Sequence, residues 1–333
     1  MDQLGLKSDD GHSKKLEKLL EKRGLKLDDF LSSIEYTLEP NYWDYLNVET
    51  LTSLQKPLTA FPDEMIFIVY HQISELYFKL CIHELELLTG TSRQYPNRPV
   101  ADAAEWIKRL KRIDFYFNQL NSSMALMHKK GDIELLDRAE FTKFRLALFP
   151  ASGFQTVQFR KIEIMLTDLE NLQHKDYRIK SHDRNALYHN IYWKRGSLRS
   201  DEHNQPLLSA DGSPLKPKAL QDFEKKYDAE LLELSVHYAE KNLYHFFRHQ
   251  PTEIQQHETI LMLLKKIDKR INREWKGSHY QAVKHHLDQP GNQAGNDELG
   301  GGGTNWKTYL PPENQAIIFF PGIYPIAKEQ TGT

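Results

Sequence analysis

The stretch GSHYQAVKHH, residues 277–286, places three histidines within ten residues. His279 and His286 are seven residues apart, so on a helix they share a face but lie two turns from each other. That separation is too large for both to bind one metal ion. The sequence also has no H-E-x-x-H motif and no Glu-x-x-His pair, so it does not match a zinc hydrolase or a di-iron bundle.

A single histidine can still be the only protein ligand of a haem iron, because the porphyrin supplies four nitrogens. His279 suits this role better than its neighbours, since Tyr280 and Val283 accompany it on an apolar helical face. His285 and His286 follow Lys284 towards a loop. The residues alone leave two interpretations of His279 open: an axial ligand, or an ordinary structural or surface histidine.

His71 lies inside the apolar helical pattern IFIVYHQISELYF. A neutral imidazole there could hydrogen-bond Glu75, one turn on, and be purely structural. It could equally be the lone polar group of a pocket, placed to recognise a substrate N–H. Both interpretations remain open at this point.

Arg145 lies in EFTKFRLALFPASGFQ, between Phe144 and Leu146. A guanidinium in apolar surroundings is costly unless a carboxylate meets it, either from the protein or from a ligand. The following PASGFQ predicts a helix end and a restart, with Ser152 as N-cap. Backbone N–H groups at such a restart can hold an anion.

These side chains must be positioned by helices, because helical periodicity dominates the sequence. Long helical patterns run over residues 63–89, 101–129, 139–148, 154–172, 218–248 and 253–286, and no stretch shows repeated strand alternation. We therefore predict an all-α fold, a large helical bundle forming a single domain over 1–333. It has a helical arm at 1–38, a small non-helical excursion at 174–217 with a turn at Asp211–Gly212, and a glycine-rich loop at 288–303.

Composition narrows the class of protein. The 333 residues include 44 basic and 46 acidic side chains, a balance that indicates neither a nucleic-acid nor a membrane surface. The single cysteine, Cys81, excludes an intramolecular disulfide and a cysteine-rich metal site. Residues 1–15 lack an apolar signal segment, and no uninterrupted apolar run approaches ~20 residues. A soluble, cytoplasmic protein is expected.

Several stretches, in order, resemble the tryptophan 2,3-dioxygenase family of haem-dependent aromatic oxygenases. They are NYWDYL (41–46), FPDEMIFIVYHQISELYFKLCIHEL (61–85), FTKFRLALFPASGFQTVQFRKIE (141–163), WKGSHYQAVKHHL (275–287) and GGTNWKTYLPP (302–312). The resemblance covers about 40 to 320. The combination of Y-H-Q-x-x-E-L, F-R-x-x-L-x-P-A-S-G-F-Q and a late W-x-x-x-H is specific to this family.

The resemblance implies a role for each matching residue. His279 is similar to the axial ligand of haem b, and His71 to the distal histidine that accepts a hydrogen bond from the indole N–H. Phe67 and Phe141 resemble the walls of the indole site, and Arg145 the arginine that binds the substrate carboxylate. Ser152 matches a serine near the haem propionates. Tyr42 and Tyr45 match tyrosines that a neighbouring subunit contributes, which implies a homo-oligomer, usually a tetramer.

The late glycine loop departs from the family pattern. Family members usually carry a threonine that contacts the amino-acid part of the substrate, and Gly301 occupies that position here, with Thr304 as a possible replacement. Loss of one hydroxyl contact would cost roughly 0.5–1.5 kcal/mol.

The implied activity is cleavage of the indole C2–C3 bond of L-tryptophan, with O2 as co-substrate, to give N-formyl-L-kynurenine. Two alternatives remain: a haem monooxygenase or hydroxylase acting on another aromatic amino acid or a substituted indole, and a non-catalytic helical bundle.

Overall fold

The computed structural model describes residues 10–36, 41–96, 102–127, 129–130, 133–145, 147, 156–198, 206–288, 306–311, 315 and 317–324. The chain divides into two compact units, Met1–Lys56 and Pro57–Thr333. In the first unit the helices are α1 (Asp10–Glu21), α2 (Leu27–Tyr36), α3 (Tyr42–Leu46) and α4 (Val48–Ser53). Asn47, in the left-handed conformation, ends α3 and begins α4.

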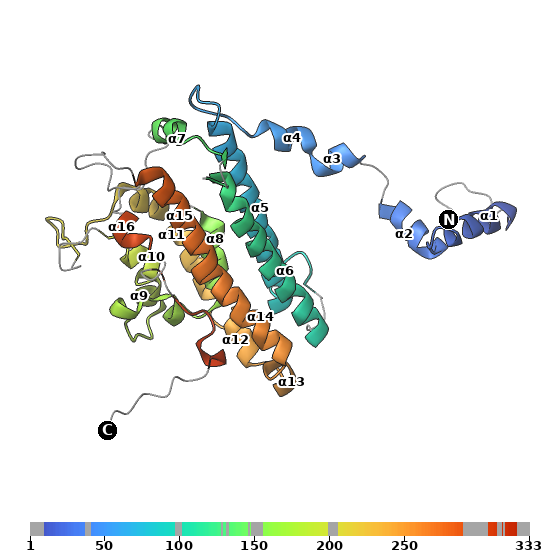
Figure 1. The fold of residues 1–333 in the computed structure, drawn as a ribbon. Helices are drawn as coiled ribbons and strands as arrows, with labels where there is room; N and C mark the ends of the chain where they lie inside the picture. Colours follow the sequence, from blue (N-terminus) through green and yellow to red (C-terminus); the bar gives the residue numbers. More distant parts are fainter. Residues whose placement is uncertain are drawn as a thin grey trace. The chain divides into compact units, whose positions relative to one another are not determined.

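The second unit is a helical bundle (Figure 1). Its helices are α5 (Glu64–Thr89), α6 (Ala103–Ser123), α7 (Arg138–Phe144), α8 (Val157–Leu166), α9 (Arg184–His189), α10 (Tyr192–Arg195), α11 (Lys218–His237), α12 (Leu243–Arg248), α13 (Thr252–Gln255), α14 (Glu258–Lys269), α15 (Lys276–Leu287) and α16 (Trp306–Tyr309). The described residues also contain short 3-10 helices, namely η2 (Met124–Met127), η4 (Leu169–Leu172), η5 (Lys175–Tyr177) and η8 (Pro321–Ile323). The described strands are β1 (Lys129–Lys130) and β2 (Ile133–Glu134), which form one antiparallel pair. The all-α prediction is confirmed.

α5 is the central element, and it packs against α6 and α8. Its inner face buries Phe78, Cys81 and Leu85, so Cys81 is a free, fully buried thiol. Within the part of the chain that the structure describes, α5 alone is long and apolar enough, by length and composition, to cross a membrane. The sequence predicts this helix but not a membrane span, because polar residues interrupt its apolar run. Those polar residues include Glu84, which is buried and paired with Arg109 at 2.6 Å as in a soluble core.

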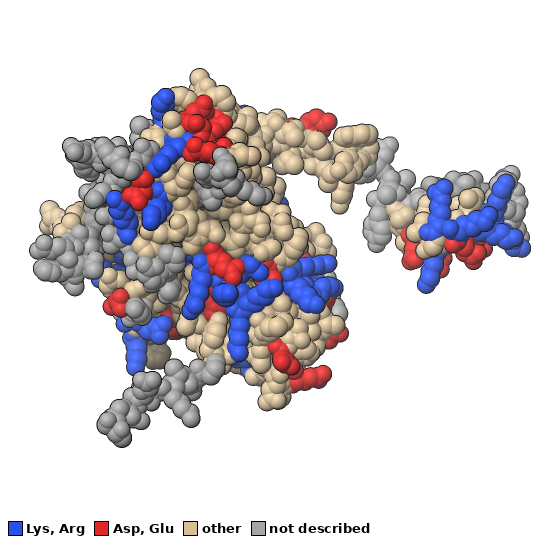
Figure 2. All heavy atoms as spheres, in the orientation of Figure 1, with Lys and Arg blue, Asp and Glu red and all other residues tan. Residues whose placement is uncertain are grey.

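The opposite side of α5 carries an outer stripe of apolar residues spaced three or four apart, as one helical face requires. These side chains are between 36% and 49% exposed: Met65, Val69, Ile73, Leu76 and Leu80. The charged side chains on the face shown in Figure 2 form mixed groups of both signs, separated by uncharged surface.

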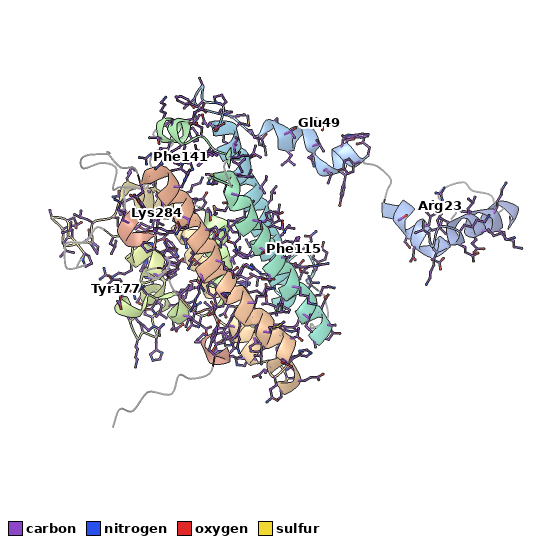
Figure 3. All side chains as sticks on the ribbon, in the orientation of Figure 1. Arg23, Glu49, Phe115, Phe141, Tyr177 and Lys284 are labelled. Carbon is purple, nitrogen blue, oxygen red and sulfur yellow. The ribbon has the colours of Figure 1, made fainter. Side chains whose placement is uncertain are left out.

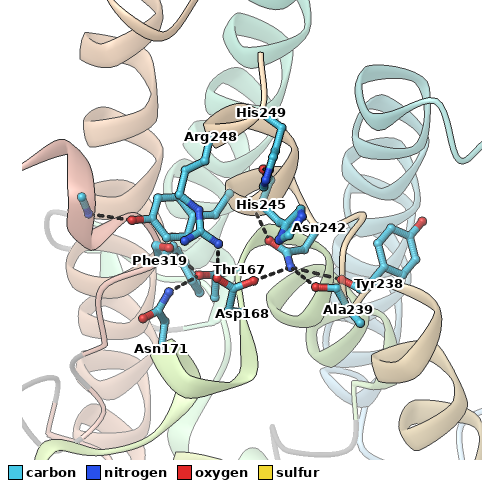
Figure 4. Close-up of polar contacts among 12 residues, drawn as sticks. Thr167, Asp168, Asn171, Tyr238, Ala239, Asn242, His245, Arg248, His249 and Phe319 are labelled. Atoms are coloured by element: carbon cyan, nitrogen blue, oxygen red, sulfur yellow. Dashed lines mark hydrogen bonds and ion pairs between the residues drawn. The ribbon is translucent and has the colours of Figure 1, made fainter. Parts of the chain in front are cut away.

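The carboxylate of Asp168, just after α8, joins the end of that helix to the start of α12 (Figure 4). Asp168 accepts hydrogen bonds from Asn242 at 2.8 Å and from Arg248 at 2.7 Å. The neighbouring Thr167 hydroxyl donates to the carbonyl of Phe319, which attaches the C-terminal segment 317–324 to the same place. These contacts fix the far end of α8, the helix that packs against α5.

The excursion at 174–217 is not wholly irregular, because it contains α9 and α10. Asp183 accepts a hydrogen bond from Asn185 N–H and so starts α9, while Tyr192 and Trp193 of α10 are buried in the main core. The predicted turn is present: Leu208 pairs with Pro214, and Gly212 has a φ of 80°.

α14 continues into α15 through a π-helical turn, η6 (Arg270–Trp275). Arg270 is held there by Asp114 at 2.9 Å and by Glu274 at 2.7 Å. The helical pattern predicted for 253–286 is thus continuous only from Glu258 to Leu287, because α13 (Thr252–Gln255) ends before it. Within that stretch the chain changes its hydrogen-bonding pattern four residues before His279. Such turns are frequent at functional sites.

Candidate functional site

His71 and Phe67 lie one turn apart on α5, with ring centroids 4.1 Å apart and planes inclined by 37°. The Nδ1 atom of His71 is 2.7 Å from the carbonyl oxygen of Phe67. A carbonyl oxygen only accepts hydrogen bonds, so Nδ1 carries the proton and Nε2 keeps its lone pair. The protein thereby presents an imidazole whose remaining nitrogen is a hydrogen-bond acceptor.

Burial lowers the pKa of His71, although the hydrogen bond to Phe67 opposes that shift. The ring is therefore neutral at pH 7. Glu75, considered from the sequence as its partner, instead accepts a hydrogen bond from the Gln158 side chain at 2.8 Å. The purely structural interpretation through Glu75 is thus wrong, because the backbone already occupies Nδ1.

The first turns of α5 and α7 are fastened to each other. The Asp63 N–H donates to the Glu140 carboxylate at 3.0 Å, and the Asp137 N–H donates to the Asp63 carboxylate at 2.6 Å. Asp137 also caps its own helix by accepting from Glu140 N–H at 2.8 Å. Backbone donors that helix ends leave unpaired are satisfied by the neighbouring helix, and this sets α7 against α5.

This placement of α7 against α5 brings three phenylalanine rings together. Phe67 lies 6.0 Å from Phe141 and 5.6 Å from Phe144, measured between ring centroids. Phe144 is fully buried, whereas Phe67 and Phe141 are only half-buried. The two half-buried rings therefore border the space beside His71, and Phe144 supports them from the core.

His279 extends from α15 into the same region. Burial, followed by the charges of His71 and Arg160, lowers the pKa of His279 to about 4. α15 packs against α7, the helix that carries Phe141. Within the described residues His279 makes no hydrogen bond, and its ring stacks on Trp275 at 6.2 Å and 20°.

The surroundings of His279 fit a large aromatic cofactor. The Nε1–H of Trp275 is buried and has no hydrogen-bond acceptor among the described residues. Phe67, His71, Phe141, Trp275 and His279 all retain some accessible surface, although burial shifts the pKa values of both histidines. A neutral imidazole without a protein partner is the donor that a haem iron takes as its axial ligand.

Arg145 follows Phe141 by one helical turn and forms the C-cap of α7, where its N–H donates to the Phe141 carbonyl at 2.9 Å. It is half-buried. In the described residues α7 ends at Phe144, earlier than the helix predicted to reach 148. Ser152, Gly301 and Thr304 lie outside the described residues. Tyr42 and Tyr45 belong to the first unit, where both are exposed.

A buried network of charges behind Trp275 was not anticipated from the sequence. Glu163 accepts hydrogen bonds from Arg160 and from the Tyr192 hydroxyl, both at 2.7 Å, and lies 3.5 Å from the ammonium of Lys276. Burial lowers the pKa of Lys276 to about 8, and Glu163 opposes that shift. The signal was present in F-R-K-I-E-I-M-L, where an arginine and a glutamate three apart interrupt an apolar helix.

The two histidines that follow Lys284 differ from each other. His285 lies 3.0 Å from Glu134 and is partly exposed. His286 is only 3% exposed and packs on Phe141, with ring centroids 4.4 Å apart. The expectation that both lead out towards the loop is therefore wrong for His286, because the two-turn spacing that puts it on the face of His279 also turns it inwards.

Comparison with known proteins agrees with this arrangement. Residues 35–245 match the family model described as tryptophan 2,3-dioxygenase. A protein of that name from Shewanella woodyi is 27% identical over 295 residues, 87% of this chain and 90% of its own length. Proteins of that name from Ruegeria sp. (strain TM1040) and Sorangium cellulosum are 38% and 39% identical, over 126 and 137 residues. These two matches span 41% and 31% of the relatives' lengths.

Proposed function

The chain belongs to the tryptophan 2,3-dioxygenase family, and on this premise we propose that it cleaves the indole C2–C3 bond of L-tryptophan with O2. The product is N-formyl-L-kynurenine, which retains both oxygen atoms. The observation that carries this proposal is the tautomer of His71: its Nδ1–H is committed to Phe67, so Nε2 is free to accept the N–H of an indole. An imidazole with Nε2 protonated would instead oppose that N–H.

His71 therefore positions the substrate rather than removing its proton. Its lowered pKa keeps the ring neutral, so it accepts a hydrogen bond without carrying a charge into an apolar site. Phe67 and Phe141 offer aromatic faces on which the indole packs, and in doing so they exclude water from the reacting carbons. Catalysis by these residues is mainly a matter of orientation.

Haem b is the cofactor that we propose for the site: His279 would bind its iron, and by the family resemblance Ser152 would help to hold it. When bound, haem iron supplies the binding and activation of dioxygen. The neutral state of His279 supports this assignment, because a protonated imidazole has no lone pair for a metal. The partnerless Trp275 Nε1–H beside it is a donor available to a bound group.

Arg145 binds the substrate carboxylate in this proposal. Arg145 follows Phe141 by one helical turn, so a cationic residue is next to a residue that packs on the indole. An aromatic amino acid as substrate needs both, a cation for its carboxylate and an aromatic surface for its ring. By the family resemblance, Gly301 stands where a threonine would contact the amino-acid part of the substrate, and Thr304 is the residue that we propose to replace that hydroxyl.

We also propose that the protein is a cytoplasmic homo-oligomer, a tetramer by family resemblance, in which Tyr42 and Tyr45 complete the site of a neighbouring subunit. Two observations support self-association. The outer stripe of α5 leaves five apolar side chains at least 36% exposed, the pattern of a helix that packs against another protein surface. Tyr42 and Tyr45 are 68% and 73% exposed, unusual for tyrosines in a folded unit.

The decisive test is to reduce haem-loaded protein without oxygen, add L-tryptophan and 18O2, and measure the product mass. A gain of two 18O atoms is the expected result. A gain of one atom would replace the proposal with the monooxygenase alternative, and protein that takes up no haem would remove both.

A further inference from the structure

His286 has no role in the reaction outlined above, yet its surroundings are unusual. Its Nε2 atom contacts the Met127 carbonyl oxygen, so Nε2 carries the proton and donates it. The Nδ1 atom is then a lone-pair acceptor, and it is buried without a partner among the described residues. A methionine or leucine would fill a similar volume and leave no nitrogen unpaired. Packing alone therefore does not explain a histidine at this position.

The contact with Phe141 supplies a reason. The His286 and Phe141 ring centroids are 4.4 Å apart with an interplanar angle of 38°. This is closer than the approach of Phe141 to Phe144, 5.4 Å, or to Phe67, 6.0 Å. Among the described rings His286 is thus the nearest neighbour of Phe141. Among the described ring pairs, Phe67 and His286 contact Phe141 but not each other.

Phe141 needs such support because its own helix is short. α7 has seven residues, and Phe141 lies in its middle with a half-buried ring. α15, by contrast, has twelve residues and packs against both η2 and α7. Figure 3 labels Phe141 on α7 and Lys284 on α15. The bond to Met127 ties the imidazole to η2 as well. His286 is therefore held by its own helix, α15, and by η2, and the Phe141 ring packs against it.

We propose that His286 is a positioning residue that fixes the Phe141 ring relative to Phe67, and that this placement selects substrates by the size of their ring. This inference rests on the proposed function, in which Phe67 and Phe141 pack on the indole. The Met127 hydrogen bond orients the imidazole, and the imidazole face supports the phenylalanine. Removing the imidazole lets Phe141 retreat and leaves more room for a larger ring.

The kinetic test compares three variants as haem-loaded proteins. In His286→Ala we expect KM for L-tryptophan to rise about tenfold with kcat nearly unchanged, as for a lost packing contact. Relative kcat/KM for tryptophans methylated on the six-membered ring should rise at least about fivefold. His286→Gln keeps a donor near the position of Nε2, so we expect it to restore most of the lost affinity. His285→Ala, on the neighbouring position, is the matched control and should leave both ratios unchanged.

A second readout does not depend on turnover. The protein is labelled with 4-fluorophenylalanine, and the 19F resonance of Phe141 is assigned by its loss in Phe141→Leu. We expect this resonance to shift and broaden in His286→Ala, to return in His286→Gln and to be unaffected in His285→Ala. An unchanged resonance in His286→Ala overturns the inference. A shifted resonance with unchanged substrate selectivity overturns the selective role.

The two readouts separate this inference from the proposed function. Wild-type protein that binds haem but leaves tryptophan untouched refutes the proposed function, and the 19F spectrum still decides whether His286 positions Phe141.

Discussion

The burial of His286 also leads to a prediction about how the free energy of unfolding depends on pH, which can be tested without substrate. Burial is the largest cause of a shift that lowers the pKa of His286 from an ordinary 6.5 to about 4. Between these two values the unfolded chain binds a proton at His286 that the folded chain does not. The free energy of unfolding therefore falls as the pH falls, by about 1.4 kcal/mol per unit from this residue. From pH 6.5 to pH 4 the loss is about 3 kcal/mol, a large part of a typical stability.

His286→Gln removes the titrating group but keeps a donor for Met127. At pH 7.5 we expect it to be less stable than wild type by about 1 kcal/mol, because the hydrogen bond is imperfectly replaced. At pH 4.5 it avoids a penalty of about 2.7 kcal/mol, so it should be the more stable protein. The order of stability of the two proteins therefore reverses between these two pH values.

Urea unfolding of the haem-free proteins, followed by circular dichroism at several pH values, measures this directly. Phe141→Leu is the matched control, because it disturbs the same contact with no titrating group. Its unfolding free energy should lie below that of wild type by a constant amount at every pH. If His286→Gln instead runs parallel to wild type down to pH 4.5, His286 is protonated equally in both states, and the argument from its burial is refuted.

Four further predictions concern the site and the assembly. His279→Ala should bind no haem, whereas His286→Ala retains it, as a Soret absorption titration will show. His71→Ala should slow turnover without losing haem, and a rate equal to wild type in steady-state oxygen uptake would contradict the tautomer argument. Arg145→Leu should raise KM for L-tryptophan by about two orders of magnitude, since a charge-assisted bidentate pair is lost, and near-normal saturation kinetics would place the carboxylate elsewhere. Leu76→Lys, in the outer stripe of α5, should lower the oligomer's mass in sedimentation velocity while the melting temperature changes little, because Leu76 is 49% exposed in the single chain.

The helices were predictable because their apolar residues recur with helical spacing over many turns. α5, predicted over 63–89, occupies Glu64–Thr89. The turn at Asp211–Gly212 was predictable because few residue pairs adopt its backbone conformation. His71, Arg145 and His279 became candidates because each is a polar group in an apolar pattern, which is costly unless it has a partner or a purpose. Phe67 and Phe141 became candidates only through the family resemblance.

The parts that sequence reasoning missed depend on contacts between distant segments. The partner of His71 was not Glu75 but a carbonyl on its own helix, and no side-chain pattern encodes a backbone acceptor. His286 looked like a residue at a helix end, because periodicity gives the face of a helix but not the element that covers it. The covering element is η2, which approaches across 159 residues of chain.

The π-helical turn η6 has a consequence for how the chain tolerates changes in length. An α-helix advances about 100° per residue, and a π turn accommodates one residue more than an α turn. Deleting a single residue within Arg270–Trp275 would let the turn relax to α geometry with α14 still seated in the core. Because the turn already absorbs one extra residue, the side chains after it would keep roughly their present directions. His279 and His286 would therefore stay in the site, whereas the same deletion within the regular turns of α14 or α15 ahead of them would rotate both by about 100°.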